Sequence, residues 1–120
     1  MEIVPVPQLA DNYAYLLIDP RSRDAAVVDC AEAGPVLDEA RRRSARLVAV
    51  LATHHHFDHV GGHDDLLKSN AALRIFGSAD DAARIPGITD RLRDGETIRP
   101  AGLPARVILI PAHTSGHVAY

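Results

Sequence analysis

The segment Thr53–His59 is the feature that most constrains how this chain can fold. It places four histidines and one aspartate within seven residues, and the pair Gly61–Gly62 follows shortly after it. Imidazole nitrogens and carboxylate oxygens are ligands that zinc and related divalent metals bind readily. Side chains two apart in an extended segment point the same way, so His54 and His56 can hold one ion together. The fold therefore has to present this segment as a metal site.

Asp58 and His59 lie past the bend of this segment, where they can reach a second ion beside the first. His55 would point away from its two neighbours, which favours a structural or supporting role for its ring. The alternative is a histidine-rich, solvated loop that binds nothing. A surface stretch has no reason, however, to gather so many groups that titrate near neutral pH.

A second histidine cluster supports the first. The apolar run Val107–Ile110 leads into the loop Pro111–His117, which carries two more histidines. His113 in this loop would complete a three-histidine set with His54 and His56. Three imidazoles leave one position of a zinc ion open, as expected of a catalytic site, whereas a structural site would more often use cysteines. The chain has a single cysteine.

The remaining candidate side chains have competing structural explanations. His63 falls in the first turn of a predicted helix and is expected at the surface. His117 is expected to stabilise its loop, with metal contact as the alternative. Asp29 ends a predicted strand, where it either orients a metal-bound imidazole or caps a turn. Cys30 follows that strand and is expected to be a small core residue rather than a nucleophile.

The composition is that of an ordinary globular domain. The 120 residues allow one domain at most, with 47% hydrophobic and 24% charged residues. The net charge of −3 shows no excess of positively charged residues, which argues against nucleic acid as a partner. No apolar stretch is long enough to span a membrane, and the N-terminus lacks the pattern of a signal peptide. With one cysteine and therefore no internal disulfide, the expected location is the cytoplasm.

The order of predicted elements indicates an α/β (α+β) fold, a mixed sheet with flanking helices. The first three strands look like an antiparallel meander, and the prolines of the first strand suggest an edge. The fourth strand is nearly all aliphatic, as in a strand covered on both faces. Segment 80–93 is ambiguous, apart from a turn at Pro86–Gly87. Strands are predicted over residues 3–6, 13–18, 25–29, 47–52, 73–76, 97–98 and 106–110, and helices after Gly34–Pro35 and over 60–68.

Four motifs lie along the chain. They are Asp-Asn-Tyr-x-Tyr-Leu at 11–16, Ala-Val-Val-Asp at 26–29, Thr-His-His-His-x-Asp-His at 53–59 and Pro-x-His-Thr-Ser-Gly-His at 111–117. Together they resemble the metallo-β-lactamase superfamily and, within it, the glyoxalase II (hydroxyacylglutathione hydrolase) family, and the resemblance covers essentially the whole chain.

The resemblance implies a metal-dependent thioester hydrolase. It assigns His54, His56 and His113 to a first metal and Asp58 and His59 to a second. The nucleophile would be a metal-activated hydroxide and not a side chain, acting on an S-(2-hydroxyacyl)glutathione such as S-lactoylglutathione. The products would be a hydroxy acid and glutathione. The expected cofactor is Zn²⁺, two per complete site, although the same ligands also accept iron or manganese.

The resemblance is to the N-terminal half of the family's proteins. Their fold is a four-layer αββα sandwich, whose second half supplies a bridging aspartate, one more histidine and much of the glutathione contact. We therefore expect residues 1–120 to form a truncated metallo-β-lactamase-like domain, the first half of that sandwich. Such a chain would bind at most one zinc tightly. It would also leave an apolar sheet face uncovered, which invites self-association.

Two alternatives to the hydrolase stay open at this point. The first is another enzyme of the superfamily, such as an iron-dependent sulfur dioxygenase or a lactone hydrolase. The second is a truncated metal-binding module without turnover. The expected partner in the leading interpretation is a small glutathione thioester, with no nucleic acid and no membrane.

Overall fold

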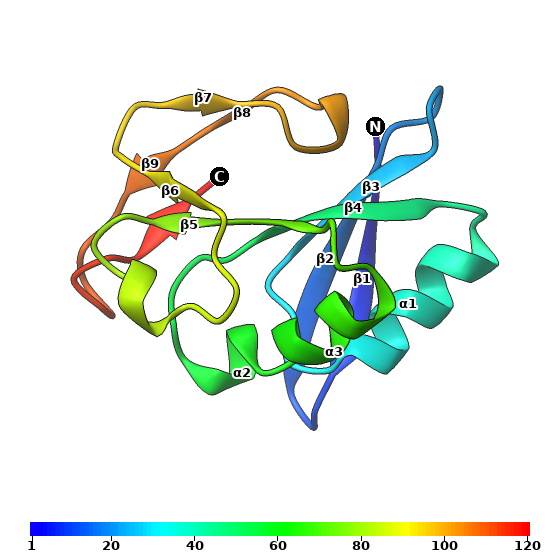
Figure 1. The fold of residues 1–120 in the computed structure, drawn as a ribbon, viewed down its shortest axis with the longest axis horizontal. Coiled ribbons are helices and arrows are strands. Elements are labelled where there is room, and N and C mark those ends of the chain that lie inside the picture. The colour runs from blue at the N-terminus through cyan, green and yellow to red at the C-terminus, as the bar shows by residue number, and fades with distance from the viewer.

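The computed structural model describes all of residues 1–120, and a six-stranded mixed sheet forms its centre (Figure 1). The spatial order of the strands equals their order in the chain. The first three are antiparallel, as predicted, and the third to sixth are parallel. The strands are β1 (Glu2–Gln8), β2 (Asn12–Ile18), β3 (Asp24–Val28), β4 (Arg46–Leu51), β5 (Arg74–Ser78) and β6 (Asp90–Leu92).

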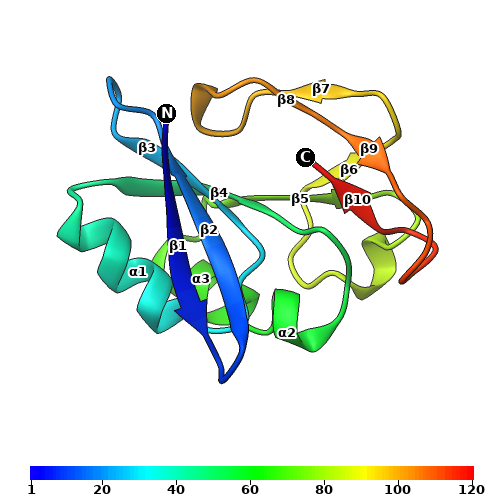
Figure 2. The ribbon, with the colours of Figure 1, turned by 180° about the vertical axis from the view of Figure 1, so that it is seen from behind.

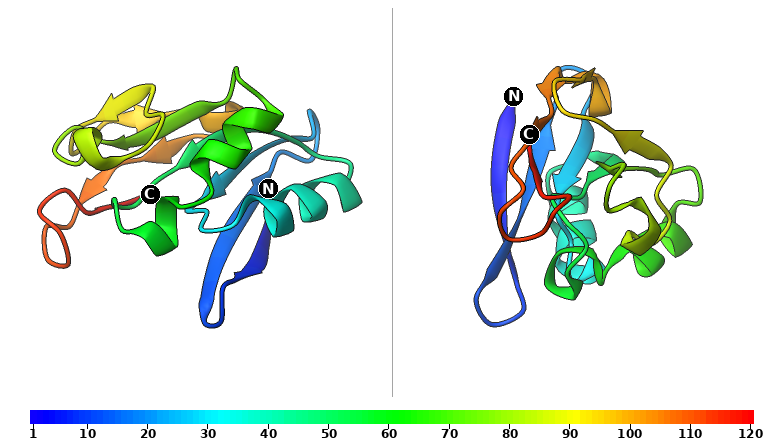
Figure 3. Two further views of the ribbon diagram at one scale, coloured as in Figure 1. Left: turned by 60° about the horizontal axis from the view of Figure 1, so that its bottom comes forward. Right: turned by 90° about the vertical axis from the view of Figure 1, so that its left-hand side faces the viewer.

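The helices lie on one face of this sheet, as two further views show (Figure 3). None of them has the length and apolar character needed to cross a membrane. The helices are α1 (Ala33–Arg42), α2 (Phe57–Val60) and α3 (His63–Ser69), with 3₁₀ turns at Ala82–Arg84 and Pro100–Gly102. The helix predicted over 60–68, starting at the glycine pair, is α3, which begins at His63, and the short helix α2 before the glycines was not predicted. A Cβ at Gly62 would lie 2.7 Å from the sulfur of Cys30, so this close contact requires a glycine.

Two short hairpins cover part of the opposite face. They pair β7 (Thr97–Ile98) with β8 (Ala105–Arg106), and β9 (Ile108–Leu109) with β10 (Val118–Ala119), seen side by side in Figure 2. The prediction of one strand over 106–110 is therefore wrong. The buried Val107 breaks it, because its N–H donates to the carbonyl of Glu96 (2.8 Å) and the chain then changes partner.

Apolar side chains fill both sides of the sheet. One core lies between the sheet and the helices and includes Val36, Val50 and Leu66, while a smaller one lies under the hairpins. The fourth strand contributes to both cores, which confirms that both of its faces are covered. Cys30 is fully buried, as predicted, and burial followed by the nearby Asp29 carboxylate raises the pKa of its thiol to about 12.

The prediction that His63 lies at the surface is wrong. Its side chain is fully buried at the start of α3, and its Nδ1–H donates to the carbonyl of Pro86 at 2.9 Å. The turn at Pro86–Gly87 folds over the N-terminal end of this helix and so removes the ring from solvent. Burial lowers the pKa of His63, and the ring is held in its neutral form.

Replacing His63 by Asn should reduce the acid sensitivity of the fold. The native ring resists protonation, whereas the unfolded chain takes up a proton near its ordinary pKa of 6.5. The free energy of unfolding therefore falls as pH decreases below about 6.5, by at most about 1.4 kcal/mol per unit of difference between the two pKa values. The neutral amide of His63→Asn can still donate to Pro86 but does not titrate. Denaturant titrations at about pH 7.5 and about pH 5 measure the effect. Equal losses of stability in both proteins on acidification would contradict this account.

Candidate metal centre

The site lies where neighbouring parallel strands end. Asp29 follows β3 directly, and the segment Thr53–His59 follows β4, two strands that pair in parallel. Because the carboxyl ends of parallel strands meet at one edge of the sheet, the two segments come together there. The loop between β9 and β10 reaches the same edge and carries His113.

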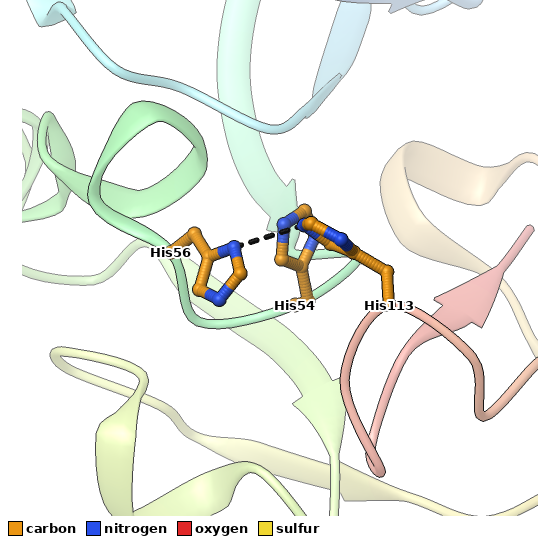
Figure 4. Close-up of side chains that lie close together, drawn as sticks. All are labelled: His54, His56 and His113. Carbon is orange, nitrogen blue, oxygen red and sulfur yellow. Dashed lines mark hydrogen bonds between the residues drawn. The ribbon is translucent and has the colours of Figure 1, made fainter.

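Three histidines converge at this edge (Figure 4). The ring centroids of His54, His56 and His113 are 4.6 to 4.9 Å apart. The Nε2 atom of His113 lies 3.0 Å from the Nδ1 atom of His56. In a tetrahedral zinc site with Zn–N bonds of about 2.0–2.1 Å, two ligand nitrogens lie about 3.3 Å apart. One pair of nitrogens is therefore close to that spacing, and the candidate ligand atoms of all three residues lie within 4.8 Å of one another.

Hydrogen bonds determine which nitrogen of His54 carries its proton. The carboxylate of Asp29 can only accept, so the hydroxyl of Thr53 donates its single hydrogen to it (2.9 Å). That hydroxyl must then accept from Nδ1–H of His54, at 2.8 Å. The Nε2 atom of His54 is left with a free lone pair, which is the form needed for metal ligation.

The environment of His54 fits a cation. Its side chain is 2% exposed, and its Nε2 atom is buried without a hydrogen-bond partner. Burial, followed by the nearby rings of His59 and His117, lowers the pKa of His54 to about 4, so the ring is neutral at physiological pH. A buried acceptor without a partner costs stability, and a divalent ion between the three rings would supply the missing partner.

Asp58 and His59 lie beside the three-histidine cluster but outside it. Their facing atoms, Oδ2 of Asp58 and Nε2 of His59, are 3.3 Å apart. Nδ1–H of His59 donates to Asp29 at 2.7 Å, and this bond is the main cause that raises the pKa of His59. Asp29 therefore does orient an imidazole, one of the two roles considered for it. Binding of a second ion by Asp58 and His59 stays a prediction.

Asn12 holds the carboxylate of Asp58 from a distant part of the chain. The turn between β1 and β2 brings its side-chain NH₂ to Oδ2 of Asp58 (2.9 Å) and to the carbonyl of the same residue (3.2 Å). This bond is the main cause that lowers the pKa of Asp58. The carboxylate is thus kept charged and fixed in direction before any ion arrives.

The structure also places residues whose roles the sequence left open or did not reveal. The ring of His117 lies 4.5 Å from that of His54, and its backbone closes the hairpin of β9 and β10 through the N–H of Ile110 (2.8 Å). His55 is outside the three-histidine cluster, with its ring 4.9 Å from that of His56, and it pairs with Asp81 at 2.9 Å. Asp81 was not singled out by its sequence context. Its position just after an apolar strand, like that of Asp29, is the signal that could have found it.

Comparison with known proteins shows which protein family the chain matches. Residues 10–120 match the family model of the metallo-beta-lactamase superfamily. A hydroxyacylglutathione hydrolase of Synechococcus sp. (strain JA-2-3B'a(2-13)) is 49% identical over 120 residues, which are 100% of this chain and 48% of that protein. One from Methylococcus capsulatus is 50% identical over 120 residues, covering 100% of this chain and 46% of that protein. The chain thus spans about half the length of these relatives.

The fold is similar to that of solved metallo-beta-lactamases. The crystal structure of the B3 metallo-beta-lactamase BLEG-1 superimposes with a TM-score of 0.85 at 19% sequence identity, covering 99% of this chain and 66% of that one. The mixed sheet with its flanking helices therefore corresponds to part of the metallo-beta-lactamase fold, as predicted.

Replacing Asn12 by Ala should release the carboxylate of Asp58. We expect the pKa of Asp58 to rise towards its ordinary value, and the free energy of unfolding to fall by about 1–2 kcal/mol, because a hydrogen bond to a charged group is lost. Carboxyl carbon NMR during a pH titration measures the first effect and denaturant unfolding the second. Asp11→Ala, an exposed neighbour in the same turn, is the matched control. An unchanged Asp58 titration in Asn12→Ala would rule out this role.

Proposed function

Because the chain belongs to the metallo-beta-lactamase superfamily, we propose that it has the chemistry of a metal-dependent hydrolase of S-(2-hydroxyacyl)glutathione thioesters. S-lactoylglutathione is the substrate we propose to test, and the products would be a hydroxy acid and glutathione.

The choice of reaction within the superfamily rests on sequence identity. The chain is 49% and 50% identical, over its whole length, to two hydroxyacylglutathione hydrolases, against 19% identity to a metallo-beta-lactamase of the same fold. The neutral, buried His54 with its free Nε2 supports the metal site on which that reaction depends.

We propose that His54, His56 and His113 hold one divalent cation. Zinc is the ion that three imidazoles suit well, and iron or manganese is compatible with the same ligands. When bound, the ion supplies Lewis-acid charge and lowers the pKa of a coordinated water, which provides a nucleophile at neutral pH. This fits the state of the single cysteine, Cys30, which is buried with a raised pKa and so is unsuited as a nucleophile.

The protein's own groups prepare the site for this chemistry. Asp29 hydrogen-bonds His59 directly and His54 through the Thr53 hydroxyl, and so holds both rings with Nδ1 protonated. Nε2 of His54 is left without a partner, and Nε2 of His59 faces Asp58. Asp58 and His59 are the residues we propose for a second ion. Since they are only two ligands, we expect one ion to be held tightly and a second weakly.

We further propose that the chain self-associates through the sheet face opposite the helices. Every outward position of the β1–β2 hairpin on this face is apolar, from the cross-strand pair of Ile3 with Leu17 to that of Pro5 with Tyr15. Ile3 is 59% exposed and Tyr15 45% exposed. The face continues into an apolar hollow of about 520 Å³ bounded by Leu103 and its neighbours. A contiguous apolar surface of this kind favours a protein partner.

Zinc-loaded protein should hydrolyse S-lactoylglutathione, with release of glutathione thiol as the measured product, and metal-free protein should not.

Elemental analysis should find one tightly bound zinc per chain. His113→Ala removes one ligand and should weaken zinc binding by more than about 100-fold, the upper range for losing a supporting residue. Ser115→Ala, exposed in the same loop, is the control. Folded, zinc-loaded protein without hydrolysis would reject the enzyme and favour the metal-binding module, and two tightly held ions would reject the proposed stoichiometry.

Self-association should be visible by sedimentation velocity as a concentration-dependent shift. Ile3→Lys and Tyr15→Lys place a charge on the apolar face and should move the equilibrium at least about 10-fold towards monomer, since burying an unpaired charge is costly. Leu9→Lys is the matched control, because Leu9 is also exposed (49%) but lies at the tip of the hairpin. A wild-type protein that stays monomeric and melts in one sharp transition would refute the proposal.

A further inference from the structure

We infer that Asp81 is a positioning residue that sets the spacing between the two loops carrying the three histidines. The inference rests on the proposed function only in taking those histidines as metal ligands. It adds a residue that touches neither substrate nor ion and acts through its contacts with both loops.

Asp81 is a buried carboxylate placed just after β5. Its side chain is 1% exposed, and only one of its oxygens, Oδ2, has a hydrogen-bond partner, Nδ1–H of His55 at 2.9 Å. The other oxygen, Oδ1, is buried without a partner. A buried carboxylate with one unpartnered oxygen is costly, so the stability of the fold alone does not account for Asp81 at this place.

The first contact of Asp81 fixes the direction of the first histidine loop. His55 stands between the two ligand residues in sequence, and its ring lies 4.9 Å from that of His56. Its hydrogen bond to the buried carboxylate of Asp81 therefore limits how the segment that carries His54 and His56 can turn. If His55 were free, the segment could rotate and the two ligand rings would lose their common direction.

The second contact of Asp81 fixes the other histidine loop. Gly116 is buried against it, and a methyl group at position 116 would lie 3.0 Å from Cγ, Oδ1 and the backbone nitrogen of Asp81. This distance is shorter than ordinary van der Waals contact, so the loop that carries His113 rests directly on the aspartate. The absence of a side chain at Gly116 is what permits the close approach.

One side chain therefore touches both halves of the metal site. His54 and His56 are set through His55, and His113 is set through Gly116, three residues further along its loop. Removing the aspartate should leave the two loops free to move relative to each other. The metal would then have to order them on binding, and its affinity should fall by about 10- to 100-fold, the usual effect of losing a residue that supports ligands.

A positioning role can be separated from a purely electrostatic one. The negative charge of Asp81 would favour any nearby cation regardless of loop geometry. Asp81→Asn removes this charge but keeps the size of the side chain and an oxygen that can accept from His55, whereas Asp81→Ala removes all three. Asp80→Asn changes the same charge at the exposed neighbouring position and is the matched control.

Cobalt(II) is the probe, because its visible absorption reports ligand geometry as well as binding. We expect Asp81→Ala to bind cobalt about 10- to 100-fold more weakly than wild type and with an altered spectrum. Asp81→Asn should recover most of the affinity and the wild-type spectrum, and Asp80→Asn should match wild type. Wild-type affinity and spectrum in folded Asp81→Ala, or an Asn variant as weak as the Ala variant, would overturn the inference.

A second variant covers the case in which Asp81→Ala does not fold. His55→Ala removes the same hydrogen bond from the more exposed side and should also weaken cobalt binding about 10-fold, with wild-type affinity overturning the inference. The readout also separates this inference from the proposed reaction. Wild-type protein that binds cobalt but does not hydrolyse the thioester would end the hydrolase proposal and leave the role of Asp81 standing.

Discussion

The parallel alignment of β3, β4 and β5 is the constraint on which the rest of the site depends. Their carboxyl ends meet at one edge of the sheet, so three segments distant in sequence emerge together. Each strand end supplies one part of the site: Asp29 after β3, the segment Thr53–His59 after β4, and Asp81 after β5. The two carboxylates then hold the histidine segment from both sides, through Thr53 on one and His55 on the other. The histidine segment is thus held at two points by residues that follow strands of the rigid sheet.

Asp29 shows what this arrangement costs locally. Its backbone has a φ of 56°, in the left-handed region that residues with side chains adopt at a cost of about 1–3 kcal/mol, although aspartate tolerates it better than most. The turn brings its carboxylate against three donors: the backbone N–H and hydroxyl of Thr53 and Nδ1–H of His59. No glycine could make these bonds. The strained turn thus presents the side chain that sets the tautomer of two candidate ligands, His54 and His59.

The parts of this arrangement that could be predicted from sequence are those with local signals. The aliphatic run of β4 predicts a strand buried on both faces, and the histidine run after it predicts that His54 and His56 meet, although the chain bends at Thr53 and His54 instead of staying extended. Contacts between distant segments leave no such pattern. The place of His63 in the first turn of a predicted helix predicts a surface position, yet a turn 23 residues away buries the ring. The partnership of Asp81 with His55 likewise depends on the pairing of β4 with β5, which no local pattern specifies.

The third histidine is the least constrained member of the cluster. His54 is buried in the sheet edge, whereas His113 is exposed in a loop between two strands of two residues each. That hairpin is tied to the end of β4 by the N–H of Val118, bonded to the carbonyl of Thr53 (2.9 Å), and by the hydroxyl of Tyr120, bonded to that of Ala52 (2.7 Å). These two bonds and the packing of Gly116 against Asp81 set the position of the hairpin, while His113 itself is exposed at its tip. Metal affinity at this site should therefore depend less on the buried ligands than on the ordering of the His113 loop, because the free energy of binding includes that of completing the fold.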